Sequence, residues 1–146
     1  DEQWVQDALL KYSKRLKHYL PFEFEVIPNL KKTKSLSEAQ QKEKEGSLIL
    51  KMLNPTDKVV ILDEKGKEYR SVDFAKHLQQ QMNSRVKRLV FIIGGPYGFS
   101  AELYAKAQAK LSLSKMTFSH QMIRPFFMEQ LYRAMTILKN EPYHHE

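Results

Sequence analysis

Apolar residues recur at intervals of three and four in two stretches of the chain, which is the spacing of an amphipathic helix. The first stretch spans residues 3–18, where the periodic positions include Trp4, Val5, Ala8, Leu9, Tyr12 and Leu16. The last runs from about His120 to Lys139, with Ile123, Phe127, Leu131, Met135 and Leu138 on one face. We therefore expect a helix near each end of the chain.

Serine residues ahead of other stretches predict three more helices, because a serine side chain can accept a hydrogen bond from the free amides of a first turn. In the first of these stretches two capping boxes overlap, one pairing Ser35 with Glu38 and the other Ser37 with Gln40. The expected helices cover residues 35–53, 71–82 and 100–110, with Ser71 and Ser100 as caps of the second and third.

Short apolar runs predict buried strands at residues 59–62 and 89–93, and the alternation within 22–27 predicts a third strand. Polar segments separate these elements. We expect loops or turns at 28–34, 54–57 and 63–67, and a strand end or shaped loop at 111–119.

Two-sided apolar strands that alternate with helices are typical of a mostly parallel sheet with helices on both faces. We therefore expect an α/β fold, with residues 1–146 forming a single domain. Ligands of such sheets bind beyond the carboxyl ends of the strands. Those ends are Leu62-Asp63 and Ile93-Gly94-Gly95.

Composition excludes several classes of protein. The chain holds no cysteine, which rules out disulfide scaffolds, thiol nucleophiles and cysteine-ligated metal centres. Its longest apolar run, Leu89–Ile93, is too short to cross a membrane. No signal peptide is visible, so we expect a cytoplasmic protein with no membrane partner. His144 and His145 lack a third ligand at suitable spacing, so we expect no metal site.

Lysine and arginine number 24 against 17 acidic residues, a net charge of +7. Such an excess favours polyanionic partners, with RNA or DNA first. No basic tail is present, so folding must assemble any nucleic-acid surface.

The segment Gly94-Gly95-Pro96-Tyr97-Gly98 follows an expected strand and can bring backbone close to a ligand. A tight turn before a helix is the simpler interpretation. The dinucleotide fingerprint would need glycine at position 93, which is Ile93, and this argues against an NAD-dependent oxidoreductase.

The last helix carries three further candidates. Glu129 and Arg133 lie four residues apart, as in an ordinary helix ion pair or in a site. His120 is either a helix-start histidine or a functional one. Pro125 should kink a helix that starts at His120, but it suits the first turn of one that starts near Arg124.

Three stretches resemble the ribosomal RNA large-subunit methyltransferase H family. They are Phe91–Gly98, Leu111–Gln121 with its Ser-Leu-Ser-Lys-Met-Thr-Phe run, and Glu129–Ala134 together with the closing Glu141–His144. Lys42–Gly46 matches the family's second helix, and the resemblance covers essentially the whole chain. Members of this family belong to the SPOUT class and have a knotted α/β fold, which implies a carboxy-terminal trefoil knot at about residues 89–146.

This resemblance implies a homodimeric enzyme that methylates N3 of a pseudouridine in 23S rRNA on assembled ribosomes, using S-adenosylmethionine. It places the cofactor against backbone at three strand ends. The matching positions are Leu62, Gly94, Gly95, Leu113, Ser114, Lys115, Met116, Thr117 and Phe118.

The resemblance also implies that Glu129, Arg133, Tyr143 and His144 face the target base. We assign Arg133 the role of stabilising negative charge on the base or on a phosphate. His144 is the expected proton acceptor because an unperturbed histidine titrates near neutral pH. Glu129 is the candidate for orienting Arg133.

Two departures from the family leave an alternative open. A first strand, which the family has before the helix that holds Trp4, is absent from this sequence. Pro125 replaces an expected aliphatic residue. A ribosome-associated RNA-binding protein with the same fold and weak catalysis is therefore the second hypothesis, and cofactor binding separates the two.

Overall fold

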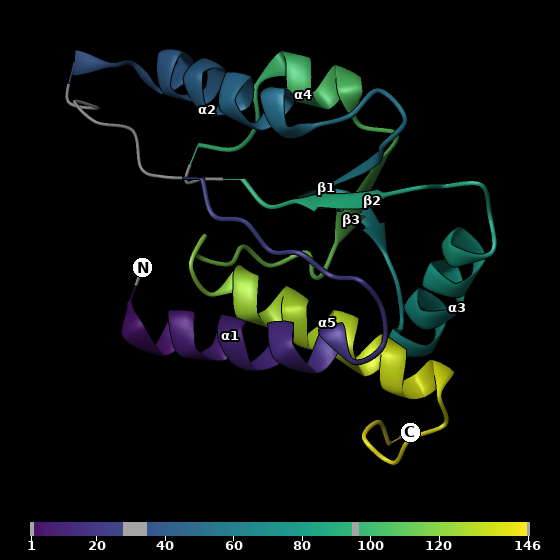
Figure 1. Ribbon diagram of the computed structural model, residues 1–146. Coiled ribbons are helices and arrows are strands. Elements are labelled where there is room, and N and C mark those ends of the chain that lie inside the picture. The colour runs from purple at the N-terminus through teal and green to yellow at the C-terminus, as the bar shows by residue number, and fades with distance from the viewer. Residues whose placement is uncertain (1, 28–34, 95–96, 146) are drawn as a thin grey trace.

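The computed structural model describes residues 2–27, 35–94 and 97–145, in which helices and strands alternate along most of the chain (Figure 1). The elements are α1 (Gln3–Lys17), α2 (Glu38–Met52), β1 (Lys58–Glu68), α3 (Ser71–Met82), β2 (Leu89–Ile92), α4 (Ala101–Lys106), β3 (Ala109–Ser112) and α5 (Ile123–Leu138). The expected loop at 28–34 and the residues Gly95 and Pro96 lie outside the described part.

The sheet has three parallel strands in the order β2-β1-β3, which confirms the predicted α/β class. β1 is central, and its register sets Val59 opposite Val90 on one side and Leu62 opposite Leu111 on the other. β2 and β3 therefore end at the same edge, level with Ile61 and Leu62 of β1, and ligands of parallel sheets bind at such an edge.

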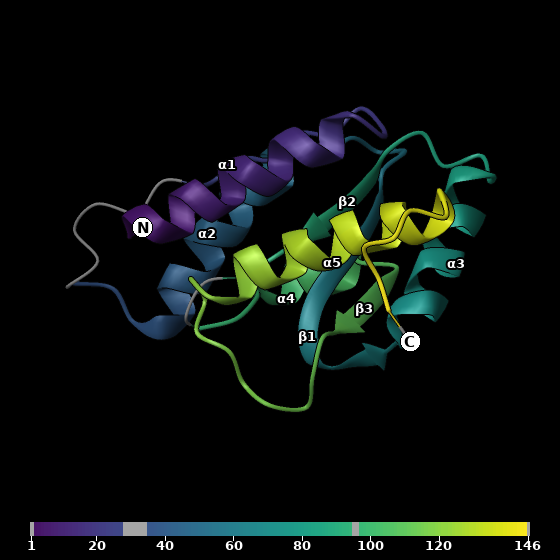
Figure 2. The ribbon, with the colours of Figure 1, turned by 90° about the horizontal axis from the view of Figure 1, so that it is seen from below.

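Successive side chains of β1 face opposite layers of helices, as the two-sided apolar sequence predicts. Val60 is buried in a core formed with α1, α3 and α5. Val59 and Ile61 are buried in a second core with residues of α2 and of the segment around α4. Figures 1 and 2 show the two layers on either side of the sheet, with α1 and α5 side by side in one of them.

The strand predicted at 22–27 is wrong. This segment is extended but pairs with no strand of the described residues. Phe22 and Phe24 pack against the core beneath α1 and α5, while Glu23 and Glu25 are exposed. The alternation therefore reflects one side of an extended chain that covers the core, without the backbone pairing of a strand.

Three predicted boundaries also need correction. Residues 63–67, expected as a turn, belong to β1 because Lys67 and Glu68 pair again with β3 after a register shift. The helix expected to reach Lys110 ends at Lys106, and Lys110 pairs with Ile61 in β3 instead. Ser71 is the first residue of α3 rather than its cap, and its hydroxyl donates to Gln130 Oε1 at 3.1 Å.

Helix starts elsewhere follow the sequence. Ser37 forms the predicted capping box with Gln40, and Ser100 accepts from the Leu103 amide to cap α4. α5 begins at Ile123, so Pro125 lies in its first turn, where the missing amide hydrogen breaks no helical bond. This fits the second of the two interpretations of Pro125. The trefoil knot and the single-domain boundaries stay predictions.

Gly66 marks the point where β1 rejoins β3. A β carbon added there would lie 2.7 Å from both the Leu111 nitrogen and the Lys110 carbonyl carbon, which are backbone atoms that cannot turn aside. We predict that Gly66→Ala lowers the free energy of unfolding by about 1–3 kcal/mol, the usual cost of overpacking. Urea denaturation measures this. The neighbouring exposed Lys65→Ala is the control, and equal stability of the two variants would contradict the close approach.

Candidate functional site

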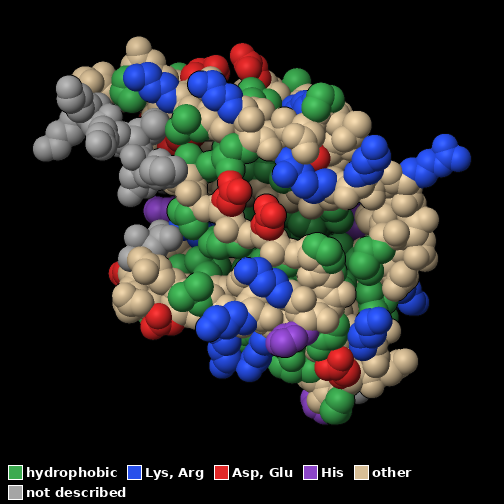
Figure 3. Space-filling model, in the orientation of Figure 1, with side chains coloured by type: hydrophobic (Ala, Val, Ile, Leu, Met, Phe, Trp, Pro, Cys, Tyr) green, Lys and Arg blue, Asp and Glu red, His purple; other side chains and the backbone are tan. Residues whose placement is uncertain are grey.

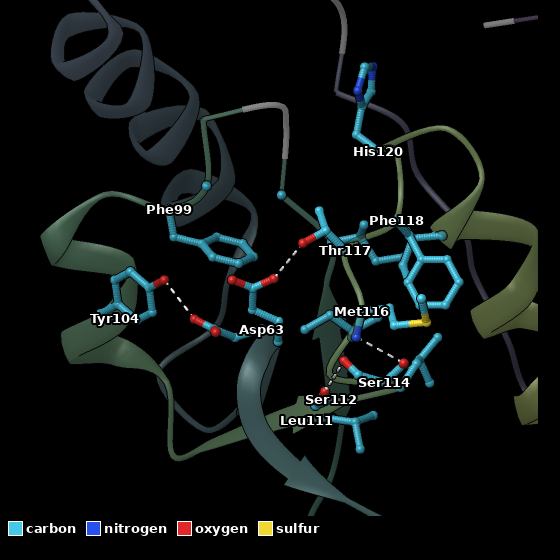
Figure 4. A pocket seen from close by; sticks show the side chains of 17 residues that line it. Asp63, Phe99, Tyr104, Leu111, Ser112, Ser114, Met116, Thr117, Phe118 and His120 are labelled. Carbon is cyan, nitrogen blue, oxygen red and sulfur yellow. Dashed lines mark hydrogen bonds between the residues drawn. The ribbon is translucent and has the colours of Figure 1, made fainter.

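A cavity of about 350 Å³ lies at the carboxyl ends of the three strands (Figure 4). β1 contributes Leu62, Asp63 and Glu64, and the segment after β2 contributes Ile93, Gly94, Gly98 and Phe99. Tyr104 of α4 and residues 111–123, among them the loop after β3, complete the wall. The site therefore forms where the sequence analysis placed the strand ends.

Polar groups close the side of the cavity formed by β1. The Tyr104 hydroxyl donates to Asp63 Oδ2 at 2.7 Å, and the Lys65 amide donates to Asp63 Oδ1 at 2.8 Å. Thr117 Oγ1 donates to Glu64 Oε2 at 2.8 Å, which joins the end of β1 to the loop after β3 (Figure 4). Two carboxylates thus face this cavity, which favours a ligand with positive charge.

These contacts shift two pKa values. The Lys65 amide, and after it the Tyr104 hydroxyl, hold the pKa of Asp63 below its usual value. Burial, together with the bond to Asp63, raises the pKa of Tyr104 to about 12. At neutral pH Asp63 is therefore ionised and Tyr104 keeps its proton as the donor.

The loop after β3 is shaped by its own hydrogen bonds. Ser112 Oγ donates to the Ser114 carbonyl at 2.8 Å, and the Met116 amide donates to Ser114 Oγ at 3.0 Å. These bonds turn Met116 outward, and its side chain is 77% exposed at the cavity. Serine at these positions thus gives a short loop a fixed course without a helix or strand.

The absence of a side chain at Gly94 allows the backbone after β2 to lie close to the Phe99 ring. A β carbon there would lie 3.1 Å from the Phe99 ring, which is buried beneath the cavity. Gly98 has a φ of 84°, a conformation that glycine adopts without strain. Gly94 and Gly98 both line the cavity, while Gly95 and Pro96 between them lie outside the described residues.

Most residues expected to bind a cofactor line this cavity: Leu62, Gly94, Leu113, Ser114, Met116, Thr117 and Phe118. Lys115 is exposed on the same loop and is not part of the lining, and Gly95 lies outside the described residues. His120 also lines the cavity, three positions before α5 begins.

The sequence placed Asp63 at a strand end without assigning it to the site, and Glu64 and Tyr104 were missed as lining residues. Asp63 follows the strand end at Leu62, so its position was a usable signal, but the polar run 63–67 suggested a turn. Tyr104 carried no local signal, because only the packing of α4 against the sheet brings it to the cavity.

The four polar residues expected at the target base form one connected group. Arg133 Nη2 donates to Glu129 Oε1 at 2.7 Å, and the Tyr143 hydroxyl donates to the same oxygen at 2.9 Å. Arg133 Nη1 lies 3.1 Å from His144 Nδ1, and the Arg133 guanidinium lies over the Tyr143 ring at 4.8 Å. The structure thus brings α5 and the carboxy-terminal tail together.

Chemistry fixes the protonation in this group. Arginine only donates, so His144 Nδ1 is the acceptor in this contact. Burial, helped by the bond to Glu129, raises the pKa of Tyr143, which therefore stays a donor at neutral pH. The Glu129–Arg133 pair is an ordinary helix ion pair in spacing, and its further bonds to Tyr143 and His144 make it part of a larger network.

The tail is also held to the other end of the chain. The Tyr19 hydroxyl, just after α1, donates to Glu141 Oε2 at 2.7 Å. Tyr132 of α5 packs between the rings of Tyr12 and Tyr143, with ring centroids 5.9 and 4.8 Å away. The position of Tyr143 and His144 therefore depends on α1.

Among the described residues, no three His, Asp or Glu side chains are grouped so as to hold a metal ion. Within the same residues, no helix has the length and apolar character needed to span a membrane.

A parallel α/β domain with a cavity at its strand ends has the arrangement in which folds of this class bind a small molecule. A family described as "Predicted SPOUT methyltransferase" has a model that matches residues 1–144, and the chain belongs to this family. The identification that the sequence motifs suggested is thereby confirmed.

Curated relatives cover nearly the whole chain. A "Ribosomal RNA large subunit methyltransferase H" of Parabacteroides distasonis is 62% identical over 146 residues, which are 100% of this chain and 93% of the relative. Proteins with the same name from Christiangramia forsetii and Phocaeicola vulgatus are 64% identical over 140 residues and 66% over 139. Each of these matches covers 95% of this chain, and 89% and 88% of the relative.

The Asp63–Tyr104 contact gives a pH-dependent prediction. The folded-state pKa of Asp63 lies below the unfolded value of 3.8, so its contribution to stability is present above that pH and is lost as pH falls through the folded pKa. Tyr104→Phe removes one of the bonds that lower this pKa. We expect it to reduce the free energy of unfolding by about 0.5–1.5 kcal/mol near neutral pH.

The difference between wild type and Tyr104→Phe should shrink in acid, once Asp63 is protonated in both proteins. Denaturant titrations above and below the pKa of Asp63 measure it, with the exposed Tyr97→Phe as control. A difference that stays constant with pH would contradict the coupling.

Proposed function

We propose that this protein transfers a methyl group from S-adenosylmethionine to N3 of a pseudouridine in 23S rRNA. The observation that carries this proposal is a strand-end cavity lined by most of the residues expected to hold the cofactor, in a chain of the SPOUT methyltransferase family. The connected Glu129–Arg133–Tyr143–His144 network supports it, because Glu129 lines a second cavity that shares residues with the first. Its relatives' name, with ribosomal RNA large subunit as the substrate, supports the RNA target.

The residues of the cavity suit S-adenosylmethionine. Leu62, Leu113 and Met116 offer apolar surface to an adenosine, and the backbone of the same loop offers hydrogen bonds to its polar edge. Asp63 and Glu64 offer negative charge to a ligand that carries both an ammonium and a sulfonium group. When bound, S-adenosylmethionine supplies an electrophilic methyl group whose leaving group departs neutral.

The network then has to accept a proton from the base and to stabilise the negative charge on it, because N3 loses a proton as it gains the methyl group. Arg133 stabilises the negative charge that develops on the base. Glu129 holds Arg133 through the 2.7 Å ion pair, and Tyr143 holds Glu129 in turn.

His144 is the proposed proton acceptor, on the condition that its contact with Arg133 is first broken. Its Nδ1 now accepts from Arg133, so it can take up a proton only after Arg133 has turned from the ring toward the base. Binding of the substrate would thereby release His144 from Arg133 and bring the positive charge of Arg133 to the nucleobase in one movement.

We further propose that the protein acts as a homodimer on assembled ribosomes in the cytoplasm. On the face shown in Figure 3, Lys and Arg side chains lie over both helical layers, on either side of a hollow with acidic and hydrophobic side chains. Such a surface meets phosphates at its rim while its centre stays free for a base. One small domain offers few phosphate contacts. A second copy of the chain and the structured ribosomal particle would supply the further contacts needed to bind the RNA.

The decisive experiment is transfer of labelled methyl from S-adenosylmethionine to ribosomes that lack this modification. We expect label in 23S rRNA at a pseudouridine, and much less on short naked RNA. Labelling of naked RNA as efficiently as ribosomes would contradict the requirement for the particle. No label from a folded protein that binds the methyl donor would instead favour an RNA-binding role.

Substitutions test the assigned roles. We expect Arg133→Ala and His144→Ala each to lower kcat by about 10²–10⁴-fold with little change in donor affinity, because neither side chain lines the strand-end cavity. Lys139→Ala, on an exposed residue just beyond α5, is the matched control. Near wild-type turnover in either folded variant would reject the corresponding role.

A further inference from the structure

A second cavity, of about 410 Å³, adjoins the strand-end cavity. Four residues line both cavities: Leu111, Ser112, Leu113 and Phe118. Its remaining lining comes from Tyr69 and α3 on one side and from Phe126, Glu129 and Gln130 of α5 on the other. The assignments made above leave this cavity without a ligand.

The lining of the second cavity combines flat apolar surfaces with a few polar groups. Phe118 and Phe126 are 37% and 44% exposed, and their ring centroids are 5.6 Å apart. Such exposed rings can stack against a planar heterocycle, as aromatic side chains do with unpaired bases. The polar groups are Ser71, Glu129 and Gln130.

These three polar side chains form a hydrogen-bond chain with a fixed direction. Glu129 can only accept, so Gln130 must turn its Nε2 toward Glu129 Oε2, at 3.2 Å. Gln130 Oε1 therefore faces the other way, where it accepts from Ser71 Oγ at 3.1 Å. The carboxamide is thus held in one orientation at both ends. Its oxygen keeps one lone pair and its nitrogen keeps one hydrogen for a ligand.

We propose that the second cavity receives the target base and that Gln130 selects pseudouridine over uridine. Its Oε1 accepts from N1–H of the base, and its Nε2 donates to the adjacent O2. This inference rests on the proposed function, because it assigns the second substrate of the same reaction. A methyl acceptor must adjoin the donor, and the lining residues that the two cavities share place these cavities side by side.

The chemistry of the two bases explains why one acceptor suffices. Pseudouridine is attached to its sugar through C5. When the two bases are superposed on the glycosidic bond, its N1–H takes the place of the C5–H of uridine. Both bases then present the same carbonyls and the same N3–H to the enzyme. The one difference is a hydrogen-bond donor at N1 of pseudouridine. An acceptor held opposite that position therefore distinguishes pseudouridine from uridine. When uridine occupies the cavity, the second lone pair of Oε1 is covered by the base without a donor, which costs more than loss of an apolar contact would.

The same geometry orients the reacting atom. In the ring, N3 lies beyond O2 from N1, so a base held by Gln130 through N1 and O2 turns N3 toward neighbouring groups. Gln130 adjoins Glu129, which holds Arg133. The Glu129 carboxylate therefore connects Gln130, which recognises the base, with Arg133, which stabilises its negative charge.

The test compares kcat/KM on two ribosome preparations, one with pseudouridine and one with uridine at the target position. We expect wild type to prefer pseudouridine. Gln130→Met, which keeps the chain length but removes the amide, should reduce this preference about 10-fold or more, and mainly by slowing reaction with pseudouridine. Ser71→Ala, which releases one end of the carboxamide, should give a smaller reduction in the same direction.

The control is Gln80→Met, the same exchange on the exposed face of α3 outside either cavity, which should leave the preference unchanged. A folded Gln130→Met with the wild-type preference would overturn the proposal. So would a wild-type enzyme that methylates both ribosomes equally, a measurement that needs no variant. Absence of methylation by wild type on either ribosome would reject the proposed function instead, so the two failures are distinguishable.

Discussion

The register between β1 and β3 is the constraint on which the site depends. Leu62 and Lys67 both lie opposite Leu111, so the chain between them has to leave the ladder and return to it. It can return only because Gly66 allows β1 to pass close to the backbone of β3. The excursion carries Asp63 and Glu64 to the cavity, where Thr117 bonds to Glu64. A regular strand would have spread these side chains over two faces of the sheet.

The second half of the site rests on different physics. α5 supplies Glu129 and Arg133 on one face, at the spacing that lets them pair. The tail that adds Tyr143 and His144 has no regular structure of its own, and it is positioned by aromatic packing and by bonds to neighbouring elements. Strand ends thus shape one cavity, while a helix and a packed tail arrange the ionisable groups beside it.

Much of this could be predicted from local sequence. Periodicity located α1 and α5, capping predicted the start of α2, and unbroken apolar runs identified β2 and the first part of β1, although not β3. The failures share a cause. The segment 22–27 alternates like a strand, but its backbone has no partner, and residues 63–67 look like a turn, yet β3 pairs with their end. Pairing is decided by a distant segment, so alternation and polarity alone cannot reveal it. Tyr104 and Gln130 were missed for the same reason, since their partners lie far away along the chain.

The contact between the two ends of the chain has a consequence for biosynthesis. Tyr19 bonds to Glu141, and the amide of Glu2 donates to Gln121 at 3.1 Å, so α1 finds its final partners only in the last part of the polypeptide. β3, which borders both cavities, also lies in the final third of the chain. A nascent chain therefore has to hold the apolar face of α1 without its native cover until α5 and the residues that follow it have been synthesised. Neither cavity has its full wall before that moment, so a chain cut short during synthesis would lack the site altogether.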